Sequence, residues 1–204
     1  ELADLGQRGP GLAVAVHTTL RWESEKTVVE QRLAYRIANE PIRQIPLALP
    51  REVVERQTLQ VFLERDDREL IPLTVVPPTF DADTPANVVA TVECPLELLG
   101  AAELLVRYEG GWANPRVTPE MGSWRVPLSG PAADANTRVT GQRLRIVPPP
   151  LATVEVADPQ WSQETSSDLR PLGRELVLNA SGAVDGVTLR VAESFAREGG
   201  STWV

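Results

Sequence analysis

The feature that most constrains this chain is a regular alternation of apolar and polar residues over residues 27–50. From Val29 to Ile37, every second side chain belongs to one face, and charged or small residues occupy the other face. Successive side chains of a strand point to opposite sides, so this pattern predicts a β-strand with one dry and one wet face. The run breaks at residues 39–41, where Pro41 lacks the N–H that a ladder needs. The alternation then resumes through Ile45, Leu47 and Leu49.

Similar short apolar runs recur along the chain, and they are separated by turn residues. Eighteen prolines lie mostly between these runs, which is typical of short strands with tight connections. We therefore predict an all-β fold, an antiparallel β-sandwich of the immunoglobulin-like or a similar type. The runs expected to be strands include residues 12–22, 59–64, 70–76, 87–93, 103–109, 123–128 and 142–147.

Helical signals are short and few. Residues 51–57 are mostly polar and are compatible with one helical turn. Residues 94–100 have proline near the start and glycine at the end, and this arrangement predicts a short helix.

The three prolines at 148–150 predict a stiff spacer and a domain boundary. We assign a β-sandwich domain to residues 1–147 and a smaller β-rich part to residues 151–204. The second part is too short for a comfortable core of its own. It therefore either packs on the first domain or lacks strands that lie outside this chain. We expect the chain to be a piece of a longer protein.

The charge balance disfavours nucleic acid as a partner. The chain carries 28 acidic and 20 basic residues, for a net charge of −8, and the basic residues form no cluster. Such a surface repels a phosphate backbone. No apolar run of about 18 residues is present, so we expect no membrane insertion by this chain. Cys94 is the single cysteine, which excludes an internal disulfide.

Catalytic motifs are missing from the sequence. His17 is the only histidine, so any Ser-His-Asp or Cys-His site would have to use it, and no glycine-flanked serine elbow is present. One histidine and one cysteine are too few for a classical zinc site. No phosphate-binding glycine loop occurs. We therefore predict that the chain is not an enzyme and binds no cofactor.

Two kinds of residue remain as candidate sites. Asp81 and Asp83 offer oxygen ligands that suit a cation such as calcium, although turn aspartates are also common for backbone reasons. Trp112 and Trp161 fall on predicted loops, where an indole can stack on a sugar or anchor a protein partner. The structural alternative is that these rings plug the end of a sandwich or seal a domain junction.

No close family is identified from the sequence. The segment from Asn39 to Pro50 resembles the stretch of VIT domains in which an asparagine and an apolar-Pro-Leu-Pro run link two strands. The resemblance covers about a dozen residues, and the aromatic residue before the last prolines is absent here. It implies an extracellular β-rich module beside an adhesion-type domain. The chain is also generically similar to the amino-terminal sandwich of zinc aminopeptidases and to sandwich modules of bacterial envelope proteins.

These observations favour a non-catalytic structural or protein-interaction module of a larger, extracytoplasmic bacterial protein. Its partners would be other domains of the parent protein or a separate protein. Two alternatives stay open: a carbohydrate-binding module that uses Trp112 and Trp161, and an accessory domain of an enzyme whose catalytic part lies elsewhere.

Overall fold

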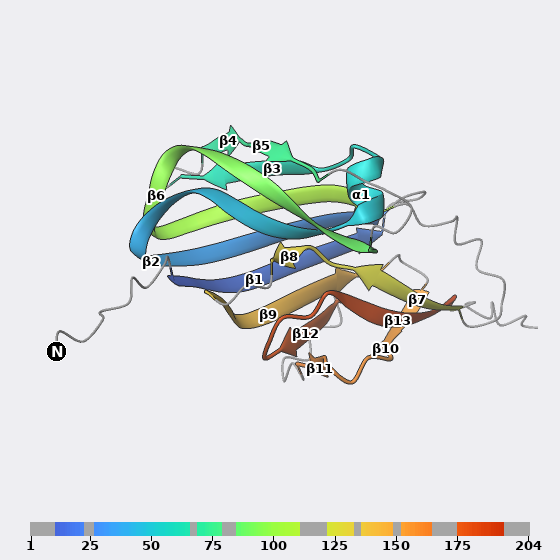
Figure 1. Cartoon of the computed structure of the whole chain (residues 1–204). Helices are drawn as coiled ribbons and strands as arrows, with labels where there is room; N and C mark the ends of the chain where they lie inside the picture. Colours follow the sequence, from blue (N-terminus) through green and yellow to red (C-terminus); the bar gives the residue numbers. More distant parts are fainter. Residues whose placement is uncertain are drawn as a thin grey trace, which may run out of the picture.

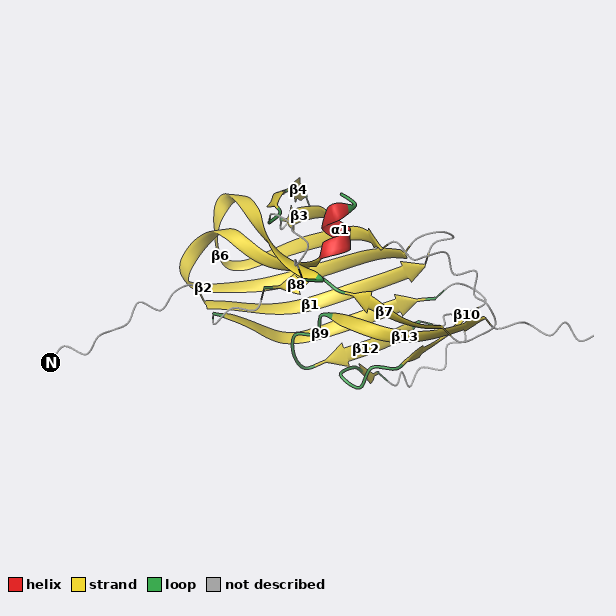
Figure 2. Ribbon diagram, turned by 45° about the vertical axis from the view of Figure 1, so that its right-hand side comes forward, coloured by secondary structure: helices red, strands yellow, loops and turns green. Residues whose placement is uncertain are grey.

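The computed structural model describes residues 11–22, 27–65, 69–78, 85–110, 122–132, 136–148, 152–164 and 175–193, and they are mostly β-structure (Figures 1 and 2). In chain order the elements are β1 (Gly11–Trp22), β2 (Thr27–Pro50), α1 (Arg51–Glu55), β3 (Gln60–Glu64), β4 (Leu70–Pro72), β5 (Thr74–Val76), β6 (Asn87–Gly110), β7 (Gly122–Pro127), β8 (Gly130–Pro131), β9 (Thr137–Val147), β10 (Ala152–Val156), β11 (Ser162–Gln163), β12 (Leu176–Ala180) and β13 (Gly186–Glu193).

The strands form one large mixed sheet and one small antiparallel sheet. The large sheet has ten strands, with the order β11-β12-β9-β1-β2-β6-β3-β4, while β5 pairs with β6 and β8 pairs with β2. The small sheet has the order β10-β13-β7. The expectation of a wholly antiparallel arrangement is wrong at one place, because β1 and β9 run parallel. Residue alternation is the same for both directions of pairing, so the sequence pattern carries no information on this point.

The predicted faces of the first two strands are confirmed. In β2, Val29, Leu33 and Ile37 expose 2% of their surface or less, and Glu30, Arg32, Ala34 and Arg36 on the other face are more exposed. In β1, Val14 and Leu20 are fully buried. β1 pairs antiparallel along its whole length with residues 27–38 of β2, as expected for neighbours in the chain.

The longest strands, β2 and β6, bend back together at one corner of the molecule (Figures 1 and 2). Their pairing shifts register between Ile37 and Ile42 and again between Ile42 and Gln44. Asn39 and Gly100 take positive φ values of 73° and 84°. The predicted break at residues 39–41 therefore marks a bend, after which the two strands go on pairing with each other.

The predicted helix at residues 94–100 is wrong. These residues continue β6, and within them Leu98 pairs with Ile42 of β2. Proline and glycine are compatible with this strand because they lie at the corner, where regular pairing is already interrupted. Cross-strand pairing overrides the weak local helix preference. The helical turn predicted at residues 51–57 is confirmed as α1.

One hydrophobic core receives side chains from both sheets. Leu33 and Leu104 of the large sheet and Val187 and Leu189 of the small sheet are all fully buried in it. Strands on either side of the triproline pair with each other: β12 joins β9, and β13 joins β7. The described strands after residue 150 therefore belong to the same two sheets as strands before it.

Candidate functional site

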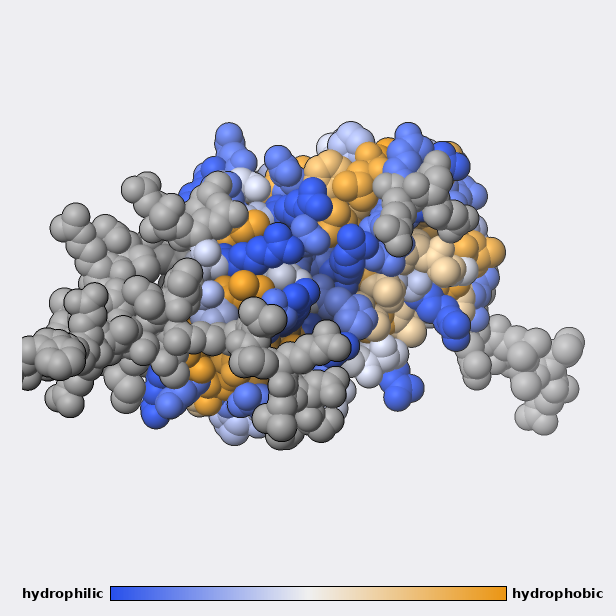
Figure 3. All heavy atoms as spheres, turned by 180° about the vertical axis from the view of Figure 1, so that it is seen from behind, coloured by the Kyte–Doolittle hydropathy of each residue, from blue (hydrophilic) through white to orange (hydrophobic). Residues whose placement is uncertain are grey.

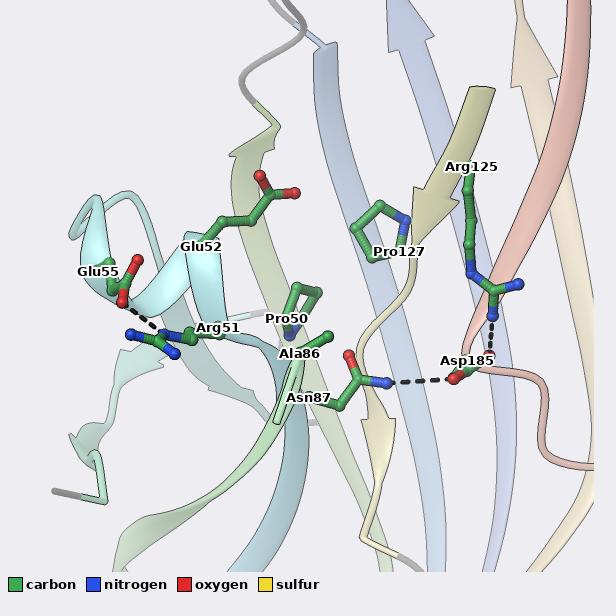
Figure 4. A pocket seen from close by; sticks show the side chains of 9 residues that line it. All are labelled: Pro50, Arg51, Glu52, Glu55, Ala86, Asn87, Arg125, Pro127 and Asp185. Atoms are coloured by element: carbon green, nitrogen blue, oxygen red, sulfur yellow. Dashed lines mark hydrogen bonds and ion pairs between the residues drawn. The ribbon is translucent and has the colours of Figure 1, made fainter. Parts of the chain in front are cut away.

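A cleft of about 400 Å³ lies where the end of β2, α1, the start of β6, the end of β7 and the start of β13 come together (Figure 4). These segments are far apart in the sequence, and they come from both sheets. Small and apolar residues form part of the cleft lining, and charged side chains form most of the rest. The lining residues are Pro50, Arg51, Glu52, Glu55, Ala86, Asn87, Arg125, Pro127 and Asp185.

The helix α1 sets one wall of the cleft. Val53 is 1% exposed and anchors the helix in the core, so Glu52 and Glu55 lie on the side away from it. The backbone N–H of Arg51 donates to the carbonyl of Ala86 at 2.8 Å, which ties the start of the helix to the segment before β6. Pro50 provides the extended residue before the helix, where no N–H is required.

The opposite wall is built around Asp185. Its carboxylate accepts hydrogen bonds from Arg125 and, at 3.2 Å, from the Asn87 side chain. Its backbone carbonyl accepts from the N–H of Leu128 at 2.8 Å. The next residue, Gly186, has no room for a side chain, because a Cβ would lie 2.8 Å from the carbonyl oxygen of Val126. This close approach fixes Asp185 against the end of β7.

Charge in the cleft is nearly, but not fully, compensated. Arg51 pairs with Glu55 at 2.6 Å, and Arg125 pairs with Asp185. Glu52 makes no hydrogen bond or ion pair with its side chain among the described residues. Figure 4 shows it reaching from α1 over Pro50 toward Pro127, between the two ion pairs. The cleft therefore holds one carboxylate whose charge no described neighbour neutralises.

A closed polar network lies in the core beneath the Pro127 wall. The Tyr108 hydroxyl lies 3.3 Å from both the Pro127 carbonyl and Gln31 Oε1, and its single hydrogen is shared between these two acceptors. Gln31 Nε2 donates to Thr18 Oγ1 at 2.9 Å and to the Ser129 carbonyl at 3.0 Å. The Ser129 N–H and hydroxyl donate to Gln31 Oε1. The network links β1, β2 and β6 to the segment between β7 and β8.

This network is sealed from solvent. Gln31 is fully buried, and Ser129 and Tyr108 are 1% and 2% exposed. Burial raises the pKa of Tyr108, and the negative charge of Glu52 adds a smaller contribution in the same direction. Burying a polar group without a hydrogen-bond partner destabilises the folded state. The strands must therefore stay in the arrangement that satisfies this network.

Of the tryptophans and aspartates singled out from the sequence, Trp161 falls within the described residues, and it does not line this cleft. Trp161 is 6% exposed, and its indole N–H donates to the carbonyl of Gly186 at 3.0 Å, immediately behind Asp185. The ring is part of the hydrophobic core, and contact of Trp161 with a ligand or partner stays a prediction. Trp112, Asp81 and Asp83 lie outside the described residues, and their roles stay predictions.

His17 lies on the outer face of the large sheet, where it is exposed. Its neighbours in register are Arg32 on β2 and Arg143 on β9, so two cations flank it. Over the described ranges, no three His, Cys, Asp or Glu side chains are placed to hold a metal ion together. In the same ranges, no helix has the length and apolar character that crossing a membrane requires.

Cross-strand ion pairs cover the outer face of the large sheet. They link Arg32 to Glu64 and Glu103, Arg107 to Glu30, Arg143 to Glu164, and Arg145 to Glu175. The view from behind shows hydrophilic residues across the middle of the molecule (Figure 3). Arg145 holds the pKa of Glu175 below its usual range, chiefly through their hydrogen bonds. These opposite charges therefore lie on neighbouring strands or next to them, where they can stabilise the sheet.

No pattern in the sequence indicates the cleft residues. Glu52, Asn87, Arg125 and Asp185 come from four separate segments and share no spacing or motif. Each is an ordinary surface residue when it is read in its own segment. The nearest signal was the helical turn at residues 51–57, which placed Glu52 on a helix without indicating what it would face.

Comparisons with known proteins do not show a family. No protein-family model matches this chain, and no curated protein matches its sequence. Among solved structures, the chain is similar to one described as a "putative nutrient binding protein" from Legionella pneumophila, with a TM-score of 0.49 and 8% sequence identity. The match covers 92% of this chain and 68% of that one. A likeness of this size carries no argument about function.

Proposed function

We propose that this chain is a non-catalytic protein-interaction module of a larger, extracytoplasmic bacterial protein, with a β-sandwich of immunoglobulin-like or similar type as its fold. The observation that carries the proposal is the composition of the cleft. Two of its three carboxylates are tied to arginines, and its wall includes Pro50, Pro127 and Ala86. Concave sites with an apolar surface and a few placed polar groups suit the binding of a ligand or side chain.

The chemistry of the cleft also supports binding over catalysis. A nucleophile needs a base within hydrogen-bond reach, and a general acid-base pair needs two poised groups. Both arginines of the cleft are engaged in ion pairs, in which Glu55 and Asp185 accept hydrogen bonds from them. The extracytoplasmic location rests on the resemblance of residues 39–50 to VIT domains and on the style of bacterial envelope modules.

The proposal predicts that the isolated chain has no hydrolase activity. Nitrophenyl esters, nitrophenyl glycosides and a fluorogenic peptide mixture should be turned over no faster than in a buffer blank. Two variants, Glu52→Gln and His17→Ala, serve as controls for any residual rate, because a contaminant would be unaffected by either substitution. Turnover that co-purifies with the chain and is lost in one of these variants would refute the non-catalytic function.

A further inference from the structure

We propose that the cleft binds a guanidinium group, with Glu52 as its charge partner and the Pro50–Pro127 surface as the seat for the attached aliphatic chain. The inference deepens the proposed function and rests on it, since it names the chemistry of the partner that the cleft would take. It is carried by three observations: the Glu52 carboxylate has no partner among the described residues, the cleft wall beside it includes Pro50 and Pro127, and the other two carboxylates of the cleft are paired with arginines.

The charge of the site selects a cation. The lining contains the carboxylates of Glu52, Glu55 and Asp185 and the guanidinium groups of Arg51 and Arg125. Because the two arginines are engaged with Glu55 and Asp185, a cation that enters the cleft meets the free charge of Glu52. The chain as a whole is acidic, with a net charge of −8, so its long-range field also attracts cations.

The shape of the site favours guanidinium over a compact ammonium. Arginine has a planar head that pairs with a carboxylate through two parallel hydrogen bonds, and it is more weakly hydrated than an ammonium. Its head therefore loses less solvation when it lies against proline rings. A cleft of about 400 Å³ is large enough for one arginine side chain and is at the low end for small-molecule sites.

Glu52 is in place to receive the head group without rearrangement. It projects from the first turn of α1, and the helix is fixed by the burial of Val53 and by the bond from Arg51 N–H to the Ala86 carbonyl. On the other wall, Arg125 is paired with Asp185. A carboxylate on an element that is already fixed avoids part of the ordering cost of binding.

The test is a titration of the whole chain that is monitored by ¹⁵N–¹H correlation spectra. The probes are N-acetyl-arginine amide, its neutral isostere N-acetyl-citrulline amide, N-acetyl-lysine amide, free agmatine, and a short peptide with one central arginine. We expect shifts confined to residues 50–55, 86–87, 125–127 and 185–186 and to the indole N–H of Trp161, which bonds to Gly186. The citrulline compound should cause no such shifts, and the lysine compound should bind more weakly than the arginine compound.

The matched variants are Glu52→Gln and Glu40→Gln. Both remove one negative charge, but Glu40 lies exposed at the corner of β2, outside the cleft lining. We expect Glu52→Gln to weaken arginine binding by about tenfold or more, as for loss of a charge-assisted hydrogen bond, and Glu40→Gln to change it less than about twofold. Binding should also weaken as salt concentration rises.

Comparing the peptide titration with the agmatine titration identifies the source of the guanidinium group. Tighter binding of the peptide than of agmatine indicates an arginine side chain of a protein partner, and the reverse indicates a small guanidinium metabolite. Equal response to arginine and citrulline compounds, equal loss in both variants, or shifts that fall elsewhere on the chain would overturn the inference. The non-catalytic function would survive that result, because only turnover by the isolated chain refutes it.

Discussion

At the scale of single residues, the most consequential side chain in the core is Gln31. The alternation of β2 places it on the buried face, where an apolar residue is the usual choice. Its amide joins Thr18, Tyr108 and Ser129, so one polar side chain connects β1 and β6 to the β7–β8 segment. A buried polar network of this kind specifies one arrangement of the strands, because any other leaves several groups without partners.

Replacing Gln31 with leucine should therefore lower the free energy of unfolding by about 2–4 kcal/mol, since it leaves several buried donors and acceptors with fewer partners. The measurement is urea unfolding followed by tryptophan fluorescence. Gln44→Leu is the matched control, because Gln44 is an exposed glutamine on the same strand, and it should change stability by less than about 0.5 kcal/mol. Equal effects of the two substitutions would contradict the structural role of the network.

At the scale of elements, glycines mark the places where strands bend or approach closely. Gly100 lies at the β2–β6 corner with a φ of 84°, which side chains rarely adopt. Gly186 starts β13 and lies so close to Val126 that a Cβ has no space. Gly130 starts β8, and a Cβ there would meet nothing within 4 Å. The three positions thus differ in why glycine is present.

The three glycine-to-alanine substitutions should rank accordingly. Gly186→Ala should destabilise the chain by about 2 kcal/mol or more, because backbone must move to admit the methyl group. Gly100→Ala should cost about 1 kcal/mol for its backbone conformation, and Gly130→Ala should be neutral or stabilising by about 0.5 kcal/mol. Thermal unfolding of the three variants under one set of conditions gives the ranking. A large loss in Gly130→Ala would show that the local geometry at β8 differs from that described.

At the scale of the whole molecule, burial of phenols in a shared core links stability to pH. Burial raises the pKa of both Tyr35 and Tyr108, with Cys94 adding to the effect at Tyr35. The folded chain therefore keeps these phenols protonated at a pH where the unfolded chain ionises them, at about pH 10 and above. The contribution of these two phenols to the free energy of unfolding is fully present below that pH, and it is lost as the pH rises toward their pKa values in the folded chain.

We accordingly expect the urea midpoint to fall between about pH 10 and 11, and to fall less steeply in Tyr35→Phe. The Tyr35 hydroxyl is buried and has no hydrogen-bond partner among the described residues, so its removal should leave stability at pH 7 unchanged or slightly higher. Burial also raises the pKa of the Cys94 thiol. Its contribution to the alkaline loss of stability is measured by repeating the urea unfolding at each pH with Cys94→Ala. An alkaline slope that is identical in Tyr35→Phe would exclude this phenol as a cause.

The sequence by itself determined which side of β1 and β2 is buried. The alternation correctly predicts the buried face in three stretches: residues 14–20, 29–37 and 45–49. Alternate side chains of a strand point to opposite faces, so a short stretch of sequence is enough to decide which face is apolar. The sequence also placed the helical turn of α1 and the bend near Pro41. These features depend on residues that are close together in the chain.

Only the tertiary structure decided how the strands pair and what meets at the cleft. The parallel pairing of β1 with β9 and the strand at residues 94–100 depend on partners that are distant in sequence, and no local pattern encodes a partner. Glu52 and Asp185 face one cleft because the two sheets share a core. The polarity of each side chain can be read from the sequence directly. Which distant residues come close together depends on how the whole chain packs around one apolar core.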